Sequence, residues 1–263
     1  MLESCAAPDA LCAPAAAADA GERCPSRSGA LSPGDGAARW GGRPRRVPAG
    51  TELRFEGDPA DSVLWVLTGW VALSKSLDDG RRQILDLVLP VDLIQAVAAD
   101  GATSSCRITA LTETVIAACA WPAFARRLAA TAALRELVDR LAAAAAARQT
   151  ERMLRLGQGT AYERVAHVLL ELFVRLEAAH QTAETAFPLP ITQTELGDLT
   201  GLTSVHVCRT LRRLARNGVI RHPDHAIVIR DVAELCRISR LSLDQFRTQI
   251  LPPGLTMARP ALA

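Results

Sequence analysis

The spacing of the apolar residues changes abruptly at Trp121-Pro122, and this change limits the folds that the chain can adopt. Before it, short apolar runs alternate with turn signals such as Gly57-Asp58-Pro59 and Asp78-Asp79-Gly80. After it, apolar residues recur every three or four positions, which is typical of amphipathic helices. The sequence therefore predicts an α+β protein with strands first and helices after.

The runs before the change have the length and spacing of short antiparallel strands. They lie at residues 63–67, 70–73, 84–89, 106–111 and 114–119. Such a pattern favours a jelly-roll-like β-roll, which we place at residues 45–121. Residues 1–44 are rich in Ala, Gly, Pro and Ser and cannot bury enough apolar surface to offset ordering entropy, so we expect a disordered extension there.

A helical region at residues 122–157 follows the β-roll. Its apolar residues at helical spacing include Leu134, Val138, Leu141 and Ala145. Six consecutive alanines at 142–147 would let a second helix approach closely, and the tract is longer than one small barrel needs. We interpret it as a dimerisation helix that ends at Gly157 and Gly159, with Thr160 capping the next helix. A helix packed only on its own barrel is the alternative.

Residues 158–263 contain the most specific pattern of the chain, two helices joined by a glycine turn. Thr192 and Glu195 have the spacing of a capping box at the start of the first helix, and Gly201 lies in the turn. The second helix is expected at residues 204–217, and a hairpin wing at 219–229 follows it. This order predicts a C-terminal winged helix-turn-helix domain.

The second helix has an apolar side and an arginine-rich side. Residues 204–230 hold six arginines and a single acidic residue, Asp224, which gives a local charge of +5 although the whole chain carries only +2. A basic amphipathic helix alone is more often a solvated face. A module whose helix-turn-helix binds only protein would be expected to lack Arg209 and the neighbouring arginines, which are present. The combination of helix, turn, helix and wing is what favours double-stranded DNA as the partner.

Arg209 is the residue that we expect to read sequence, because a guanidinium group offers two donors to O6 and N7 of guanine. Arginines further along the helix suit phosphate contacts, which position the protein without reading bases. The predicted DNA-contacting residues are Thr192, Gln193, Thr203, Ser204, Val205, His206, Arg209, Arg212, Arg213 and Arg216.

The order of β-roll, long helix and winged motif resembles the Crp/Fnr superfamily of bacterial transcription regulators over about residues 45–250. The most specific matching segments are residues 189–196 and 201–211. The resemblance implies a homodimer on a two-fold symmetric operator, with the barrel as sensor and Arg209 at the family's guanine-reading position. RNA polymerase is a further candidate partner. Val205 stands where the fumarate-nitrate branch keeps a glutamate.

The expected effector pocket departs from the cyclic-nucleotide members of that family, which hold ribose with a Gly-Glu pair and phosphate with an Arg-Ser pair. The corresponding residues here are Gln95, Ala96, Ser104, Ser105 and the nearby Arg107. Arg107 would have to reach across the strand register. Because the charge-assisted contact to phosphate is lost, we predict that cyclic AMP is not the effector.

No cofactor is predicted. Cys5, Cys12 and Cys24 are too widely spaced for an N-terminal iron–sulfur motif, although Cys106 or Cys119 could take the family's barrel position. All five histidines follow the barrel, which argues against a metal-dependent barrel enzyme, and no catalytic motif appears elsewhere. With neither a membrane span nor a signal peptide in the sequence, we expect a cytoplasmic regulator that is not an enzyme.

Overall fold

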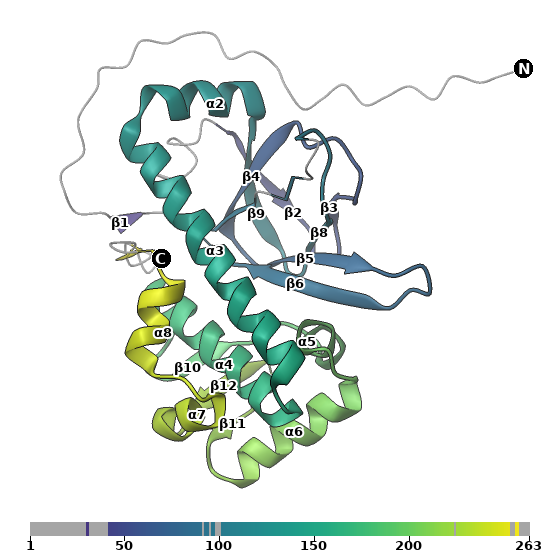
Figure 1. Cartoon of the computed structure of the whole chain (residues 1–263), viewed down its shortest axis with the longest axis vertical. Coiled ribbons are helices and arrows are strands. Elements are labelled where there is room, and N and C mark those ends of the chain that lie inside the picture. Colours follow the sequence, from purple (N-terminus) through teal and green to yellow (C-terminus); the bar gives the residue numbers. More distant parts are fainter. Residues whose placement is uncertain are drawn as a thin grey trace, which may run out of the picture.

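The computed structural model describes residues 30–31, 42–90, 92–94, 96–97, 101–223, 225–252 and 256–257. A β-roll, a long helix and a winged helical domain follow one another along the molecule (Figure 1). This arrangement confirms the predicted α+β class. The expected disordered extension at 1–44 lies outside the described residues, apart from 30–31 and 42–44.

The β-roll consists of two four-stranded antiparallel sheets, in the orders β2-β9-β4-β7 and β3-β8-β5-β6. The strands are β2 (Pro44–Val47), β3 (Glu52–Arg54), β4 (Ser62–Thr68), β5 (Val71–Ser76), β6 (Arg82–Val88), β7 (Leu93–Ile94), β8 (Arg107–Ala110) and β9 (Thr114–Ala120). Side chains such as Val66, Val71 and Ile108 fill the space between the sheets. A separate parallel pair joins β1 (Ala30–Leu31) to β13 (Thr256–Met257).

The helical region after the roll forms two helices rather than the single one expected. Helix α2 spans Trp121–Ala130 and α3 spans Ala132–Gln158, separated by Thr131 in an extended conformation. Gly157 lies inside α3, and only Gly159 ends it. One glycine lowers helix stability by only about 1 kcal/mol, which the packing of a 27-residue helix can offset.

The apolar stripe of α3 packs on the helix's own barrel. Val138 and Leu141 are buried with residues of β4, β9 and α2, and Leu134 packs against the same cluster. The stripe that predicted a dimer is therefore not free for one, because helical periodicity identifies a buried face without saying what buries it. A different, exposed face carries Ala142, Ala143, Ala146, Met153 and Leu154.

The winged domain is built around α4 (Ala161–Ala178), whose capping box between Thr160 and Glu163 confirms the predicted cap. The other elements are β10 (Ala186–Pro188), α5 (Gln193–Thr200), α6 (Ser204–Arg216), β11 (Ile220–Arg221), β12 (Ala226–Ile229), α7 (Val232–Ser239) and α8 (Leu243–Ile250). Strands β11 and β12 confirm the predicted wing. Strand β10, which precedes α5, pairs with β12 and adds to the wing.

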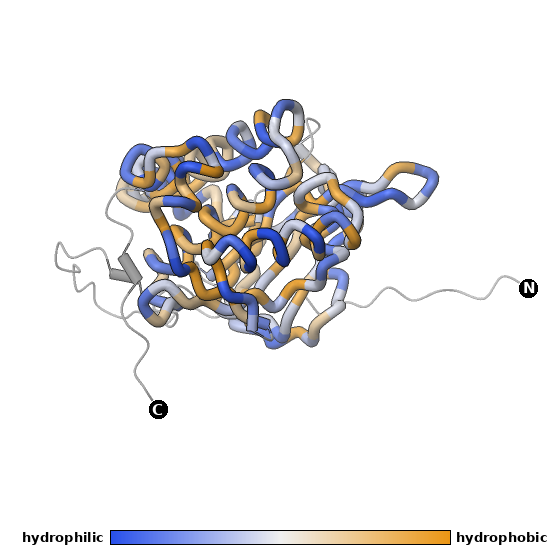
Figure 2. Tube along the Cα trace, turned by 90° about the horizontal axis from the view of Figure 1, so that it is seen from below, coloured by the Kyte–Doolittle hydropathy of each residue, from blue (hydrophilic) through white to orange (hydrophobic). Residues whose placement is uncertain are grey.

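One apolar core continues from the roll into the winged domain. Trp70, Ile84 and Leu87 of the roll pack in the same buried cluster as the apolar residues of α4, α5 and α6. Viewed from the winged end, apolar colours gather inside the molecule and hydrophilic colours follow its outer turns (Figure 2). The two domains therefore meet through a shared core and not only through a linker.

Candidate nucleic-acid interface

Helices α5 and α6 cross closely because two glycines permit it. A side chain on Gly197 would place its Cβ 2.4 Å from the carbonyl oxygen of Leu202. Gly201 ends α5 in the left-handed conformation, at φ +65°, which glycine adopts without strain. The turn therefore sets α6 against α5 at close range. Thr192 accepts a hydrogen bond from the backbone of Glu195 and confirms the predicted capping box of α5.

Helix α6 buries one side and exposes the other. Val207, Leu211 and Leu214 are 0–4% exposed and pack in the core shared with α4. Its start is capped by Thr203, whose hydroxyl oxygen accepts from the backbone N–H of His206 at 3.3 Å. The helix ends at Arg216, one residue before the expected end, with Asn217 as its C-cap.

The outward side of α6 carries three arginines in line. Arg209, Arg212 and Arg216, which we call the arginine face, recur at helical spacing and are exposed. Within the part of the chain that the structure describes, none of the three forms a salt bridge. Their charges are therefore available to a partner. All ten predicted DNA-contacting residues lie exposed on α5, α6 and their caps.

Arg213 is held in a way that the others are not. Its guanidinium carbon lies 4.4 Å from the ring centroid of Tyr162, a cation–π contact. The side-chain amide of Asn217 donates to the Tyr162 hydroxyl at 3.2 Å. Tyr162 thus fastens the C-terminal half of α6 to the first turn of α4. Sequence reasoning missed Tyr162, since a tyrosine 51 residues before Arg213 gives no local signal.

An open cavity of about 550 Å³ lies beside α6, bordered by the first turn of α4 and the end of α7. Arg209 and Arg213 line it from α6, and Arg237 and Arg240 line it from the end of α7. Arg237 pairs with Glu234 at 2.6 Å and Arg240 pairs with Glu163 at 2.7 Å. Positive charge and the N-terminus of an 18-residue helix therefore converge beside the arginine face.

The predicted effector residues do not form an open site in the described residues. The Ser104 hydroxyl donates to the carbonyl oxygens of Ala96 and Cys106, at 3.3 and 2.8 Å, and is 2% exposed as a residue. Arg107 lies 3.7 Å from Glu52 and stacks over Phe55. Gln95 lies outside the described residues.

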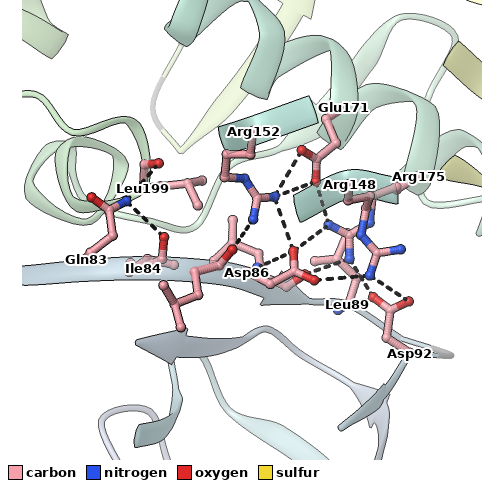
Figure 3. Close-up of polar contacts among 12 residues, drawn as sticks. Gln83, Ile84, Asp86, Leu89, Asp92, Arg148, Arg152, Glu171, Arg175 and Leu199 are labelled. Atoms are coloured by element: carbon pink, nitrogen blue, oxygen red, sulfur yellow. Dashed lines mark hydrogen bonds and ion pairs between the residues drawn. The ribbon is translucent and has the colours of Figure 1, made fainter. Parts of the chain in front are cut away.

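A group of buried charges joins the roll, α3 and α4 (Figure 3). This buried ionic cluster consists of Asp86, Asp92, Arg148, Arg152, Glu171 and Arg175. Arg152 contacts Asp86 at 3.2 Å and Glu171 at 2.9 Å, while Arg148 contacts Asp86 at 3.1 Å. With three cations and three carboxylates, the cluster is neutral and fixes α3 and α4 on strand β6.

Two carboxylates of the cluster, Asp86 and Glu171, stay ionised. Burial alone would raise the pKa of the Asp86 carboxyl, but the guanidinium groups of Arg148 and Arg152 outweigh that effect and hold the pKa well below its usual range. Burial would also raise the pKa of Glu171, but the guanidinium groups of Arg152 and Arg175 lower it. Arg175 also donates to the backbone carbonyl of Leu87 at 2.6 Å, which ties α4 to the end of β6.

Sequence reasoning missed this cluster, although a signal was present. Arg148 and Arg152 continue the three-to-four spacing of Val138 and Leu141 along the buried side of α3. Charged residues on an apolar stripe indicate buried ion pairs when partners of opposite charge are available. Glu171 and Arg175, four residues apart in an otherwise apolar helix, give the same signal.

Other site classes find no support in the described residues. No helix among them is long and apolar enough to cross a membrane. No group of three or more potential metal-ligating side chains gathers among them either. Cys106 and Cys119 are buried thiols that form no disulfide among the described residues, while Cys5, Cys12 and Cys24 lie outside the described part of the chain.

Comparison with known proteins matches both halves of the chain. Residues 44–131 match the cyclic nucleotide-binding domain family, and residues 163–238 match the Crp-like helix-turn-helix domain family. The transcriptional activator protein FnrL of Cereibacter sphaeroides is 32% identical over 205 residues, covering 73% of this chain and 78% of FnrL. The nitrogen fixation regulation protein FixK of Azorhizobium caulinodans is 29% identical over 204 residues, covering 75% and 79%.

A solved structure gives the same result. FixK2 from Bradyrhizobium japonicum superposes with a TM-score of 0.69 at 27% identity, covering 76% of this chain and 98% of FixK2. The match extends over the roll, the long helix and the winged domain together.

Proposed function

We propose a mode of DNA binding for this chain, which belongs to the Crp/Fnr family of transcription regulators: a homodimer places one helix α6 in the major groove of each half of a two-fold symmetric operator. The chain is a DNA-binding transcription regulator. Members of the family bind DNA and act as dimers, and they are regulators rather than enzymes. The proposal concerns which residues recognise bases, which bind phosphates and which form the dimer interface.

The arginine face is the observation that carries this proposal. Three exposed guanidinium groups without salt bridges among the described residues stand on a helix whose other side is anchored in the core. Arg209, in the second turn, is placed to reach base edges and to bind a guanine with two hydrogen bonds. Arg212 and Arg216 then bind phosphates, which contribute affinity rather than sequence preference.

The cavity beside α6 suits a phosphate of the DNA backbone. Arg213 is already oriented by Tyr162, so little side-chain freedom is lost when it binds. The N-terminus of α4 borders the same space but is capped by its own Glu163, so the arginine side chains would supply the contact to phosphate. Base reading and backbone binding would thus occur on adjacent sides of one helix.

The dimer is expected to form through the exposed face of α3. That face is uncharged along Ala142, Ala143, Ala146 and Met153, and Met153 is 69% exposed. Small residues allow close approach of a second copy of α3, and Met153 with Leu154 would lose water contact on pairing. This face replaces the Leu141 stripe, which the barrel already covers.

We propose that the chain uses no cyclic nucleotide in the family's usual manner and needs no cofactor. Side chains fill the space between the sheets, and the Ser104 hydroxyl is already bonded to backbone carbonyls. Action on the chromosome would place the protein in the cytoplasm, with RNA polymerase as a further partner.

Selection of bound sequences from random DNA by the full-length protein tests the proposal. The expected result is a two-fold symmetric site whose halves each contain a guanine and lie about 10 base pairs apart, centre to centre. Recovery of sites without two-fold symmetry, or of no preferred sequence, would contradict it. The Arg209→Ala protein, selected in parallel, should lose the preference at that guanine.

A further inference from the structure

Val205 is an apolar residue on the outward side of α6. It is 55% exposed, and no other large apolar side chain among the described residues of the winged domain is comparably exposed. The other exposed large apolar residues lie on the roll and on α2 and α3: Phe55, Leu77, Val97, Trp121, Met153 and Leu154. A single exposed valine is ordinary on a protein surface, but this one stands in line with the arginine face.

The position of Val205 places it beside the bases if α6 lies in the major groove. It precedes Arg209 by four residues and therefore shares its side of the helix. Four residues advance a helix by about 6 Å, which corresponds to one or two base steps of about 3.4 Å. Val205 would then meet a base edge one or two steps from the guanine that Arg209 reads.

Two neighbours of Val205 at the start of α6 are already engaged with each other. The Nδ1 atom of His206 lies 2.9 Å from the hydroxyl oxygen of Thr203, so both polar groups are engaged in the helix cap. A valine in a helix keeps essentially one rotamer, so its methyl groups are already positioned before binding. Side-chain ordering on contact therefore costs little.

The chemistry of valine restricts what it can recognise. It offers no donor or acceptor, so it cannot read the polar edges of adenine, guanine or cytosine. The one apolar group on the major-groove edges of the bases is the 5-methyl group of thymine. We propose that Val205 determines specificity by selecting a thymine, through its methyl group, one or two steps from the guanine in each half-site. This proposal rests on the placement of α6 in the major groove.

Removing that methyl group from the DNA tests the proposal directly. The selected operator is synthesised with deoxyuridine in place of each thymine in turn, at the equivalent positions of both half-sites. One position should weaken binding of the wild-type protein by about fifteenfold, since one methyl contact accounts for about fourfold and occurs twice. The V205A protein should bind the thymine and deoxyuridine operators within twofold of each other.

Two controls separate this result from other causes. R209A should keep the thymine preference while losing the guanine preference, and thermal unfolding should give V205A the wild-type melting temperature, because the side chain is exposed. If the wild type binds every deoxyuridine operator as tightly as the thymine operator, or if V205A keeps the difference, the assignment of Val205 is wrong. The guanine preference would still stand in that case, so the proposed function is tested separately.

Discussion

The buried ionic cluster and the arginine face use the same side chain in opposite surroundings. In the cluster, Arg148, Arg152 and Arg175 are 4–6% exposed and each contacts at least two carboxylates. On the arginine face, the guanidinium groups are exposed and form no salt bridge among the described residues. A buried charge must be compensated inside the molecule, whereas an exposed one can await an external anion. An arginine without an acidic partner therefore indicates a binding role, whereas the charge of an arginine alone does not.

Breaking the cluster should have the largest effect. Asp86→Ala leaves Arg148 and Arg152 short of a buried partner, which should lower the free energy of unfolding by about 3–5 kcal/mol. The melting temperature should fall by roughly 10 °C. Asp79→Ala, which removes an exposed partner of Arg81, is the matched control and should cost less than about 1 kcal/mol. If urea unfolding gave equal losses of unfolding free energy for the two variants, the contrast between buried and exposed ion pairs would be wrong.

The same comparison applies to the two faces of α3, of which one packs on the barrel and the other is exposed. Ala146→Glu, on the exposed face, should split the dimer at micromolar concentration, because two like charges would meet across the two-fold axis at a cost of several kcal/mol. Light scattering should then give the monomer mass, and circular dichroism should show the wild-type content of secondary structure. Ala129→Glu on α2 serves as control and should stay dimeric. If the Ala146→Glu protein stays dimeric, the dimer interface lies on another face.

Arg209→Ala should abolish the preference for guanine while much non-specific binding remains. One bidentate contact contributes about 1–3 kcal/mol of discrimination, and a two-fold dimer uses it twice. Binding is compared on the selected operator and on a guanine-substituted one. An equal loss of affinity on both operators would make Arg209 a backbone contact.

His167 shows what happens to a buried titratable side chain without a fixed partner. Burial lowers the pKa of His167 to about 4, despite the nearby Glu171 carboxylate, and neither ring nitrogen has a hydrogen-bond partner. The unfolded chain binds this proton more readily, so stability is complete at neutral pH and is lost as the pH falls from about 6.5 toward 4. Between about pH 7.5 and pH 5 the loss should be about 2 kcal/mol. His167→Leu should remove it in urea unfolding, and an unchanged pH profile would contradict the assignment.

The smallest effect is expected at the phosphate contacts. Arg212→Gln or Arg216→Gln should weaken binding to all sequences alike and make the dependence of log K on log salt shallower by about one unit per half-site contact. A salt series on specific and random DNA measures both quantities. If the loss of affinity depended on the DNA sequence, these residues would recognise bases and not phosphates.

The DNA-binding helix could be predicted from local chemistry, whereas the ion pairs of the cluster join residues far apart in the sequence and could not be assigned. The cap at Thr192, the turn at Gly201 and the buried side of α6 follow from residues within a few positions of each other. One partner of Arg148, Asp86, is 62 residues away in the sequence, so only the fold shows that the charge of Arg148 is compensated. The break at Thr131 was also missed, because no glycine or proline marks it in the sequence.

The shared apolar core has a consequence for how the chain folds. Because Trp70, Ile84 and Leu87 are buried with residues of the winged domain, separating the two halves would bare apolar surface on both. The boundaries suggested by the two family matches, at residues 131 and 163, are therefore not boundaries of autonomous folding units. Fragments cut between them should aggregate or stay partly unfolded, whereas the intact chain should unfold in a single cooperative transition.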